Sequence, residues 1–160
     1  MEARSRRGRV DVPRLVTPDE IQAAVRKVAG ALEQRSYEIY ERRGGPAGSE
    51  REDWYHAESE MLHPVSVEIR GAAGGMKLRA EVHGFVAPEL TICVEARRVT
   101  IVGERRAAGL RSRGSVLHAE RRGERILRFV DLPGEVNPAR TTAALKNGVL
   151  ELALTAAAPG

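Results

Sequence analysis

The hydrophobic period of the chain changes once, between residues 62 and 65. Before this point, apolar residues recur every three or four positions, as they do on one face of an α-helix. After it, apolar and polar residues alternate, as they do along a β-strand whose two faces have different surroundings. Helices at one end and strands at the other favour a mainly β protein with a helical N-terminal unit.

Two helices and a short turn are predicted over residues 17–62. Thr17 can cap the first helix, Pro18 suits its first position and Glu20 can complete a capping box. Apolar residues then follow at helical spacing: Ile21, Val25, Val28, Leu32 and Ile39. A Gly-Gly-Pro run at 44–46 ends this helix, and a second capping box opens the next one. Because the turn is short, the sequence predicts an antiparallel helical hairpin.

The rest of the chain predicts short strands separated by turns. The alternating segments are residues 65–70, 76–83, 90–95, 98–101, 116–121, 125–131, 141–145 and 149–154. No helical pattern intervenes, so the segments indicate an antiparallel β-sandwich. Aromatic residues make up only 4 % of the chain, so the core must consist mainly of Val, Leu, Ile and Ala.

Composition excludes several protein classes. Charged residues make up 30 % and hydrophobic residues 42 %, which excludes a disordered polyelectrolyte. No apolar run reaches the roughly 18 residues of a membrane-spanning helix, and the arginine-rich start lacks the apolar stretch of a secretory signal. We therefore expect a cytoplasmic protein with no membrane partner. Cys93 is the single cysteine, which excludes an internal disulfide and a multi-cysteine metal site.

The positive charge is local. Residues 1–62 carry 11 basic and 12 acidic side chains, hence −1, and residues 63–160 carry 15 and 10, hence +5. Eight arginines and three glutamates fall within residues 104–128. Such a cluster could bind a phosphate backbone. A solvated face that pairs with acids across a dimer is favoured, because no stacking aromatic residues accompany the arginines.

No residues converge on a catalytic, cofactor or metal site. His56 and Glu60 lie four residues apart on a predicted helix, but no third ligand follows them there. No serine has a G-x-S-x-G context, and the glycine-rich run 71–75 lacks the lysine of a phosphate loop. We expect the protein not to be an enzyme.

Residues 143–152 read Ala-Ala-Leu-Lys-Asn-Gly-Val-Leu-Glu-Leu. They resemble the A-x-L-x-N-G-V-L signature of the small heat shock protein (α-crystallin) family. Segments 81–85, 90–94, 99–104 and 127–133 match earlier parts of that family in the same order, so the resemblance covers about residues 63–155. The signature also predicts a tight turn that needs positive φ at Asn and Gly. The signature turn consists of Lys146, Asn147, Gly148, Val149 and Leu150.

The resemblance implies an immunoglobulin-like sandwich that holds partly unfolded proteins without ATP. It implies homodimerisation by strand exchange, through Val116, Leu117, His118, Glu120 and Arg121. It also implies an apolar groove that takes an I-x-I tail from a neighbouring subunit. The groove residues would be Leu90, Ile92, Val94, Ala144 and Leu145. Because inward strand residues usually pack, each of these side chains could be core rather than client contact.

Two departures from the family pattern concern the ends of the chain. Residues 156–160 form a predicted flexible tail without an I-x-I motif. Residues 1–16 are predicted to be a basic flexible arm, and no Phe-rich arm is present. These departures predict dimers or small oligomers rather than large shells.

Residues 18–62 resemble a short helical family of unknown function. The matching residues are Tyr37, Arg43, Gly44, Asp53, Trp54, Ala57 and Glu58. This resemblance implies no activity, and Trp54 is predicted to anchor a small core. Three functions therefore compete: an ATP-independent chaperone (holdase), a scaffold for one specific protein partner, and, least expected, an accessory that binds nucleic acid.

Overall fold

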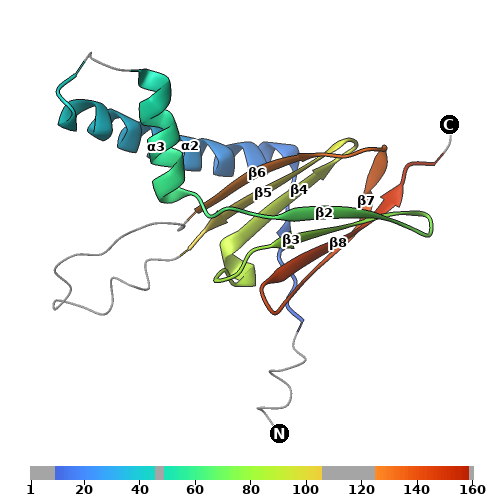
Figure 1. Ribbon diagram of the computed structural model, residues 1–160. Helices are drawn as coiled ribbons and strands as arrows, with labels where there is room; N and C mark the ends of the chain where they lie inside the picture. The colour runs from blue at the N-terminus through green and yellow to red at the C-terminus, as the bar shows by residue number, and fades with distance from the viewer. Residues whose placement is uncertain (1–9, 46–48, 106–124, 159–160) are drawn as a thin grey trace, which may run out of the picture.

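The computed structural model describes residues 10–45, 49–105 and 125–158. Within them, two four-stranded sheets pack face to face and two helices lie outside the sandwich (Figure 1). The predicted fold class, a mainly β sandwich with an N-terminal helical region, is confirmed.

The first sheet has the order β1-β4-β5-β6 and the second has the order β2-β3-β8-β7. Their bounds are β1 Arg14–Leu15, β2 Val67–Ala72, β3 Gly75–Glu81, β4 Leu90–Glu95, β5 Arg98–Glu104, β6 Arg125–Asp131, β7 Val136–Lys146 and β8 Val149–Ala156, with a 3₁₀ turn at Ala87–Glu89. All neighbouring strands are antiparallel except β1 and β4, which are parallel.

The main core lies between the two sheets. It consists of the inward side chains of the alternating strands, among them Leu78, Leu90, Ile92, Ile101, Ile126, Leu150 and Leu152, all fully buried. Because each strand carries its apolar residues at every second position, one face of each sheet turns inward.

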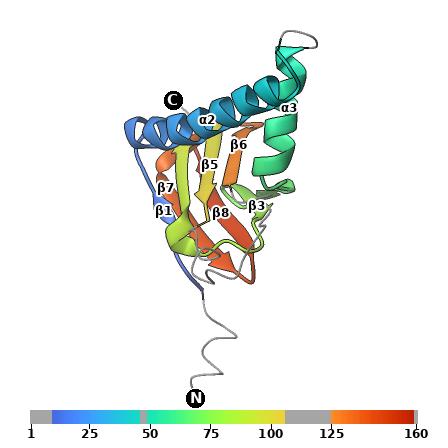
Figure 2. The same ribbon diagram turned by 90° about the vertical axis from the view of Figure 1, so that its left-hand side faces the viewer.

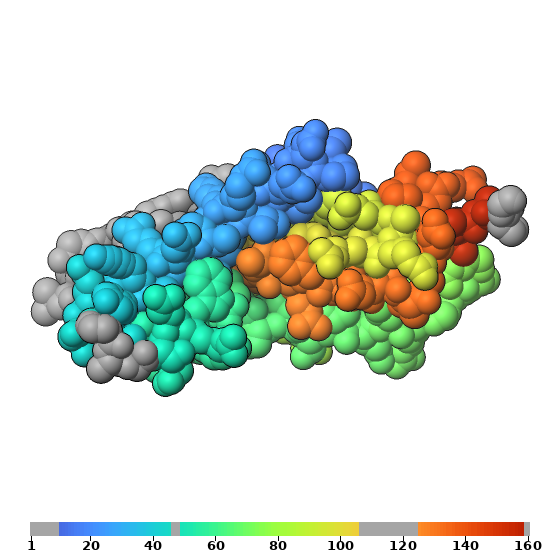
Figure 3. Space-filling view, turned by 90° about the horizontal axis from the view of Figure 1, so that it is seen from above, coloured from blue at the N-terminus to red at the C-terminus, as the bar shows by residue number. Residues whose placement is uncertain are grey.

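Helix α2 (Pro18–Arg42) and helix α3 (Glu50–Met61) form a third layer, the helical layer, on the outer face of the first sheet (Figure 2). The predicted capping box is present: the Glu20 amide donates to the Thr17 hydroxyl, and the Glu20 carboxylate accepts from the Thr17 amide. Figure 3 shows α2 lying across β4 to β6 and leaving part of that face uncovered.

A second core joins the helical layer to the sheet. Val28 and Leu32 of α2 are fully buried, and they share a cluster with Cys93 of β4 and Val102 of β5. The outward faces of β4 and β5 are thus covered as well as their inward faces. Burial raises the pKa of the Cys93 thiol, which makes it a packed rather than a reactive cysteine.

The N-terminal segment differs from the expectation of a flexible arm over residues 1–16. Residues 11–16 lie along β4 and β7 and form backbone hydrogen bonds with both strands. Strand pairing also reaches further toward the C-terminus than predicted. Ala156 pairs with Val136, and the Ala157 amide donates to the Glu135 carbonyl at 3.0 Å.

Candidate functional site

The edges of the two sheets meet where β4 and β7 approach each other, and residues 11–16 lie between them. Strand β7 ends the order of the second sheet, and β4 would end that of the first sheet without β1. We call this space the edge groove and residues 11–16 the covering segment. Figure 2 shows β1 running beside β7 below the start of α2.

Backbone hydrogen bonds attach the covering segment to both strands. The Asp11 amide donates to the Leu145 carbonyl at 3.0 Å, and the Leu145 amide donates to the Asp11 carbonyl at 2.7 Å. Further along, the Val16 amide donates to the Ile92 carbonyl at 2.8 Å. The segment is therefore an added strand that bridges the two sheets.

The side chains of the covering segment contribute less. Pro13 is buried and Val16 is partly buried in the second core. In contrast, Val12 is 71 % exposed and Leu15 is 42 % exposed. The Arg14 guanidinium donates to the Thr91 hydroxyl at 3.3 Å in an exposed position. The segment is thus held mainly through its backbone and one buried proline.

The five predicted groove residues do come together at these two strands. Leu90, Ile92, Val94 and Leu145 are buried and belong to the main core, while Ala144 is half-buried. The side chains of the first four line the sandwich interior, whereas Ala144 alternates with the core residues Ala143 and Leu145 and lies on the other face of β7. The backbone edges of β4 and β7 face the covering segment. The chemistry of the groove is consequently that of a strand edge, whose backbone amides and carbonyls pair with an extended chain.

The signature turn joins β7 to β8. Asn147 has a φ of 53° and Gly148 a φ of 78°, the left-handed conformations that such hairpin turns need. Lys146 pairs with Val149 and the buried Leu145 with the buried Leu150. The His83 ring lies where a Cβ at position 148 would point, so glycine is required there for space as well as for φ.

Two of the residues singled out in the helical unit, Arg43 and Asp53, form a polar clamp. The Arg43 guanidinium donates twice to the buried Asp53 carboxylate, at 2.8 Å each, and once to the Gly45 carbonyl at 2.6 Å. The two bonds from Arg43 lower the pKa of Asp53, against the opposing effect of burial. Gly44, with a φ of 94°, lets the chain turn immediately after Arg43.

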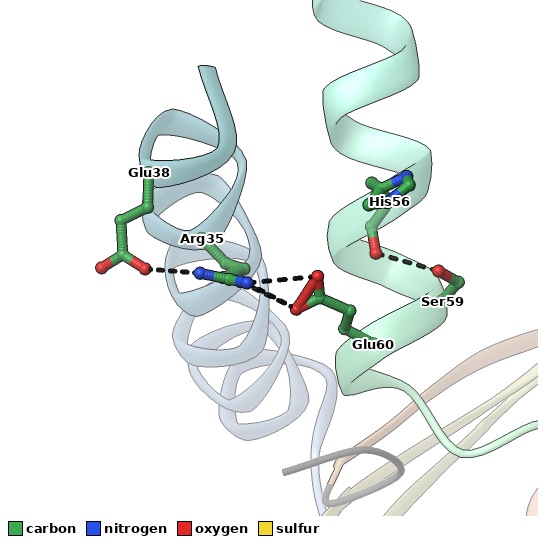
Figure 4. A network of polar contacts seen from close by, with 5 residues as sticks. All are labelled: Arg35, Glu38, His56, Ser59 and Glu60. Atoms are coloured by element: carbon green, nitrogen blue, oxygen red, sulfur yellow. Dashed lines mark hydrogen bonds and ion pairs between the residues drawn. The ribbon is translucent and has the colours of Figure 1, made fainter. Parts of the chain in front are cut away.

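Helices α2 and α3 cross at a steep angle in Figures 1 and 2, rather than packing antiparallel along their length as the short turn predicted, and two ion pairs join them. Arg35 of α2 binds Glu60 near the end of α3 with bonds of 2.9 and 3.2 Å, whereas Arg43 binds Asp53 near the start of α3. Arg35 also binds Glu38, and Figure 4 shows Glu60 turned toward Arg35 rather than toward His56. Glu60 is thus engaged in helix pairing.

A cavity of about 410 Å³ opens between the two helices. It is lined by Glu33, Ser36, Tyr37 and Tyr40 from α2 and by Glu50, Asp53 and Trp54 from α3. We call it the aromatic cavity. Ala57 is fully buried one turn beyond Trp54, and Glu58 is half-buried.

Comparison with known families agrees with this geometry. Residues 68–160, more than half of the chain, match the model described as Hsp20/alpha crystallin family. The chain belongs to that family. Residues 32–62 match a second model, described as protein of unknown function (DUF2934). No curated protein matches the chain.

The chain is also similar to solved structures of heat shock proteins. A mutant of hsp14.1 from Sulfolobus solfatataricus P2 is 19 % identical over 88 % of this chain and 94 % of its own, with a TM-score of 0.50. A small heat-shock protein from Xylella fastidiosa is 22 % identical over 61 % of this chain and 89 % of its own, with a TM-score of 0.48. Heat shock protein 16.0 from Schizosaccharomyces pombe is 20 % identical over 59 % of this chain and 75 % of its own, with a TM-score of 0.49.

Part of the predicted site of this Hsp20-family chain lies outside the described residues. The predicted dimer strand, at residues 116–121, falls there, as do most of the clustered arginines. Of the arginines that are described, Arg105 stacks over the Phe85 ring at 4.8 Å and Arg125 lies 3.7 Å from Glu104. Arg128 is exposed.

Two findings concern the described residues as a set. Among residues 10–45, 49–105 and 125–158, no three His, Cys, Asp or Glu side chains are grouped so as to hold a metal ion. No helix in the same ranges is long and apolar enough to cross a membrane.

Sequence reasoning missed the covering segment of this Hsp20-family chain. The arginines around it led to the prediction of a basic flexible arm. The informative feature is instead the apolar content of the segment itself: Val12, Pro13, Leu15 and Val16. A proline with apolar residues on both sides of it is compatible with an edge strand.

Proposed function

We propose that the protein is an ATP-independent holdase that binds partly unfolded proteins in the edge groove. One observation supports this most directly: the groove already holds an extended segment of chain through backbone hydrogen bonds to both β4 and β7. A site that binds one extended segment through its backbone can bind others, because backbone hydrogen bonds are present in every sequence.

Holding of this kind needs no covalent chemistry. An unfolding protein exposes apolar surface and unpaired strand edges, and both lead to aggregation. A groove that pairs with such an edge removes it from the aggregating population by mass action. Membership of the Hsp20/alpha crystallin family supports this proposal.

The covering segment must leave before a client can enter. The apparent affinity for a client is reduced by the fraction of molecules whose groove is open. Because Val12 and Leu15 are largely exposed, the segment has few apolar anchors to lose, and an apolar client strand can compete with it.

The domain division belongs to the same proposal. Residues 63–155 form the sandwich that carries the groove, and residues 17–62 form a helical layer that protects the outer face of its first sheet. Because the covering segment fills the groove from within the same chain, a neighbour's tail would have to displace it, and residues 156–160 carry no I-x-I motif with which to do so. We therefore expect dimers or small oligomers in the cytoplasm; a particle of about twelve or more subunits by light scattering after size exclusion would contradict this.

A scaffold that docks one specific protein partner is the second candidate. The observation that favours it is the same occupied groove, since a cover that never leaves would abolish general holding.

A disulfide that ties the covering segment to β4 and can be reduced again distinguishes the holdase from the scaffold. Arg14 and Thr91 are register partners with touching side chains, and strands about 4.8 Å apart suit a disulfide. The double variant Arg14→Cys/Thr91→Cys would join the covering segment to β4 when oxidised. The native Cys93 is buried and does not compete.

The measurement is light scattering from a model client protein that is heated with this chain at a near-stoichiometric ratio of chain to client. The holdase proposal expects suppression by the wild-type chain, loss of suppression in the oxidised double variant and recovery on reduction. The single variant Arg14→Cys, treated identically, should behave as wild type. Absence of suppression by the wild type would reject the holdase and leave the scaffold.

A further inference from the structure

The aromatic cavity collects an unusual share of the aromatic residues. The chain has one Trp, three Tyr and two Phe, and three of these six side chains, Tyr37, Tyr40 and Trp54, line this one space. Tyr37 and Tyr40 project from successive turns of α2 with their rings 6.0 Å apart and 75° to each other. Trp54 supplies the opposite wall from α3.

The surroundings of these rings are anionic. Glu33 and Glu50 line the cavity as exposed carboxylates, and neither forms an ion pair with another described residue. The charge of Glu41 raises the pKa of the nearby Tyr37. Aromatic faces attract cations because the ring quadrupole is negative at its centre, and the carboxylates add a favourable long-range charge.

The protein already uses one of these rings in this way. The Arg43 guanidinium lies 5.4 Å from the centroid of the Tyr40 ring while both its outer nitrogens are engaged by Asp53 and Gly45. The same guanidinium binds both oxygens of the buried Asp53 carboxylate, so the charge of this acid is already neutralised within the protein.

This arrangement selects among cations. A primary ammonium or a guanidinium brings N–H donors. The carboxylates left to accept them, Glu33 and Glu50, are exposed to water that competes for the same donors, because Arg43 already neutralises the buried Asp53. A quaternary ammonium brings no donors and is weakly hydrated, so the ring faces and the charge of the exposed carboxylates can hold it without hydrogen bonds. We propose that the aromatic cavity binds a quaternary ammonium group, a role independent of the edge groove.

The cavity contains its own reporter, because Trp54 is the only tryptophan of the chain. We would titrate the full-length protein with choline and follow Trp54 fluorescence against sodium chloride of equal ionic strength. The matched ligand control is the neutral isostere of choline, in which carbon replaces the quaternary nitrogen. The proposal expects a saturable change with choline and binding about 5- to 30-fold weaker for the isostere, the size of a cation–π contribution.

Two tyrosine variants provide the matched protein control. Tyr37 lines the cavity and is 52 % exposed, whereas Tyr55, on the same helical unit, is 59 % exposed and does not line it. Tyr37→Leu should weaken choline binding about fivefold or more, and Tyr55→Leu should leave it unchanged. Because both side chains are exposed, neither change should prevent folding, which the thermal midpoint would verify.

The two exposed carboxylates, Glu33 and Glu50, allow a second, independent test of charge recognition. Glu33→Gln/Glu50→Gln should weaken choline binding and leave the affinity for the neutral isostere unchanged. Equal affinity for choline and its isostere, no response of Trp54 to choline, or equal effects of Tyr37→Leu and Tyr55→Leu would each overturn the proposal. None of these outcomes bears on client holding, which is measured by light scattering.

Discussion

Two elements from the first third of the chain cover the same sheet in different ways. The helical layer covers the outer face of β4 and β5, where Val28 and Leu32 are fully buried against Cys93 and Val102. The covering segment instead covers the edge of β4, where backbone hydrogen bonds and the buried Pro13 hold it.

This difference separates a permanent cover from an exchangeable one. A buried leucine contributes several kcal/mol that no solvent contact replaces. A backbone hydrogen bond at a sheet edge contributes about 1 kcal/mol, because water or another strand can take its place. The face of the sheet is therefore closed by the fold, whereas the edge is closed only until a better strand arrives.

The largest effect is expected when one leucine in each cover is truncated, which tests whether the helical layer is held more tightly than the covering segment. Leu32→Ala should lower the free energy of unfolding by about 2–5 kcal/mol, because it leaves a cavity in the second core. Leu15→Ala should change it by less than about 0.5 kcal/mol, because Leu15 is 42 % exposed. Urea denaturation of both variants gives the two values. A similar loss in the free energy of unfolding for both variants would show that the two covers are held equally tightly.

The contrast between the covers also shows what the sequence could and could not predict. Strict alternation placed Leu90, Ile92 and Val94 on one face, and the structure buries all three. Cys93, on the opposite face, was also predicted to be a core-like residue, but the helix that covers it could not be deduced, because no local pattern tells where a distant helix docks. A cysteine and a valine on outward positions of β4 and β5 were the available signals.

The covering segment illustrates the same limit more sharply. Its pairing with Ile92 and Leu145 joins residues far apart in the sequence, and no local period encodes such a contact. The signature turn lies at the other extreme. Positive φ at Asn147 and Gly148 was predictable, because the turn chemistry is contained in two adjacent residues.

A smaller effect is expected when one hydrogen bond of the edge cover is removed. Asp11→Pro deletes the amide that donates to the Leu145 carbonyl and should destabilise the covered state by about 1 kcal/mol. The groove then opens more often, so an extended Ile-x-Ile peptide carrying a fluorophore should bind about fivefold more tightly. Fluorescence anisotropy measures the affinity.

The matched control for that experiment is Asp11→Ala. It removes the same carboxylate but keeps the backbone N–H, so the difference between the two variants isolates the hydrogen bond. Equal peptide affinities for Asp11→Pro and Asp11→Ala would mean that this bond does not control access to the groove.

The smallest expected effect is at the junction between the helical layer and the sandwich. The His63 amide donates to the Arg125 carbonyl at 2.7 Å, and its ring packs edge-on against Phe85 with centroids 5.5 Å apart. Burial lowers the pKa of His63, and the positive charges of Arg105 and His83 lower it further.

The sign of the resulting pH dependence follows from linkage. Below about pH 6.5, the usual pKa of histidine, the unfolded chain binds a proton at His63 that the folded chain resists. The free energy of unfolding should therefore fall as the pH is lowered through this range, until His63 is also protonated in the folded state. Urea denaturation between pH 7.5 and 5 should show a flatter dependence for His63→Gln than for the wild type. If the free energy of unfolding depended on pH in the same way in both proteins, the titrating group would not be His63. Because the covering segment lies on the far strand edge, peptide affinity should be the same in this variant, which keeps the junction and the groove separable.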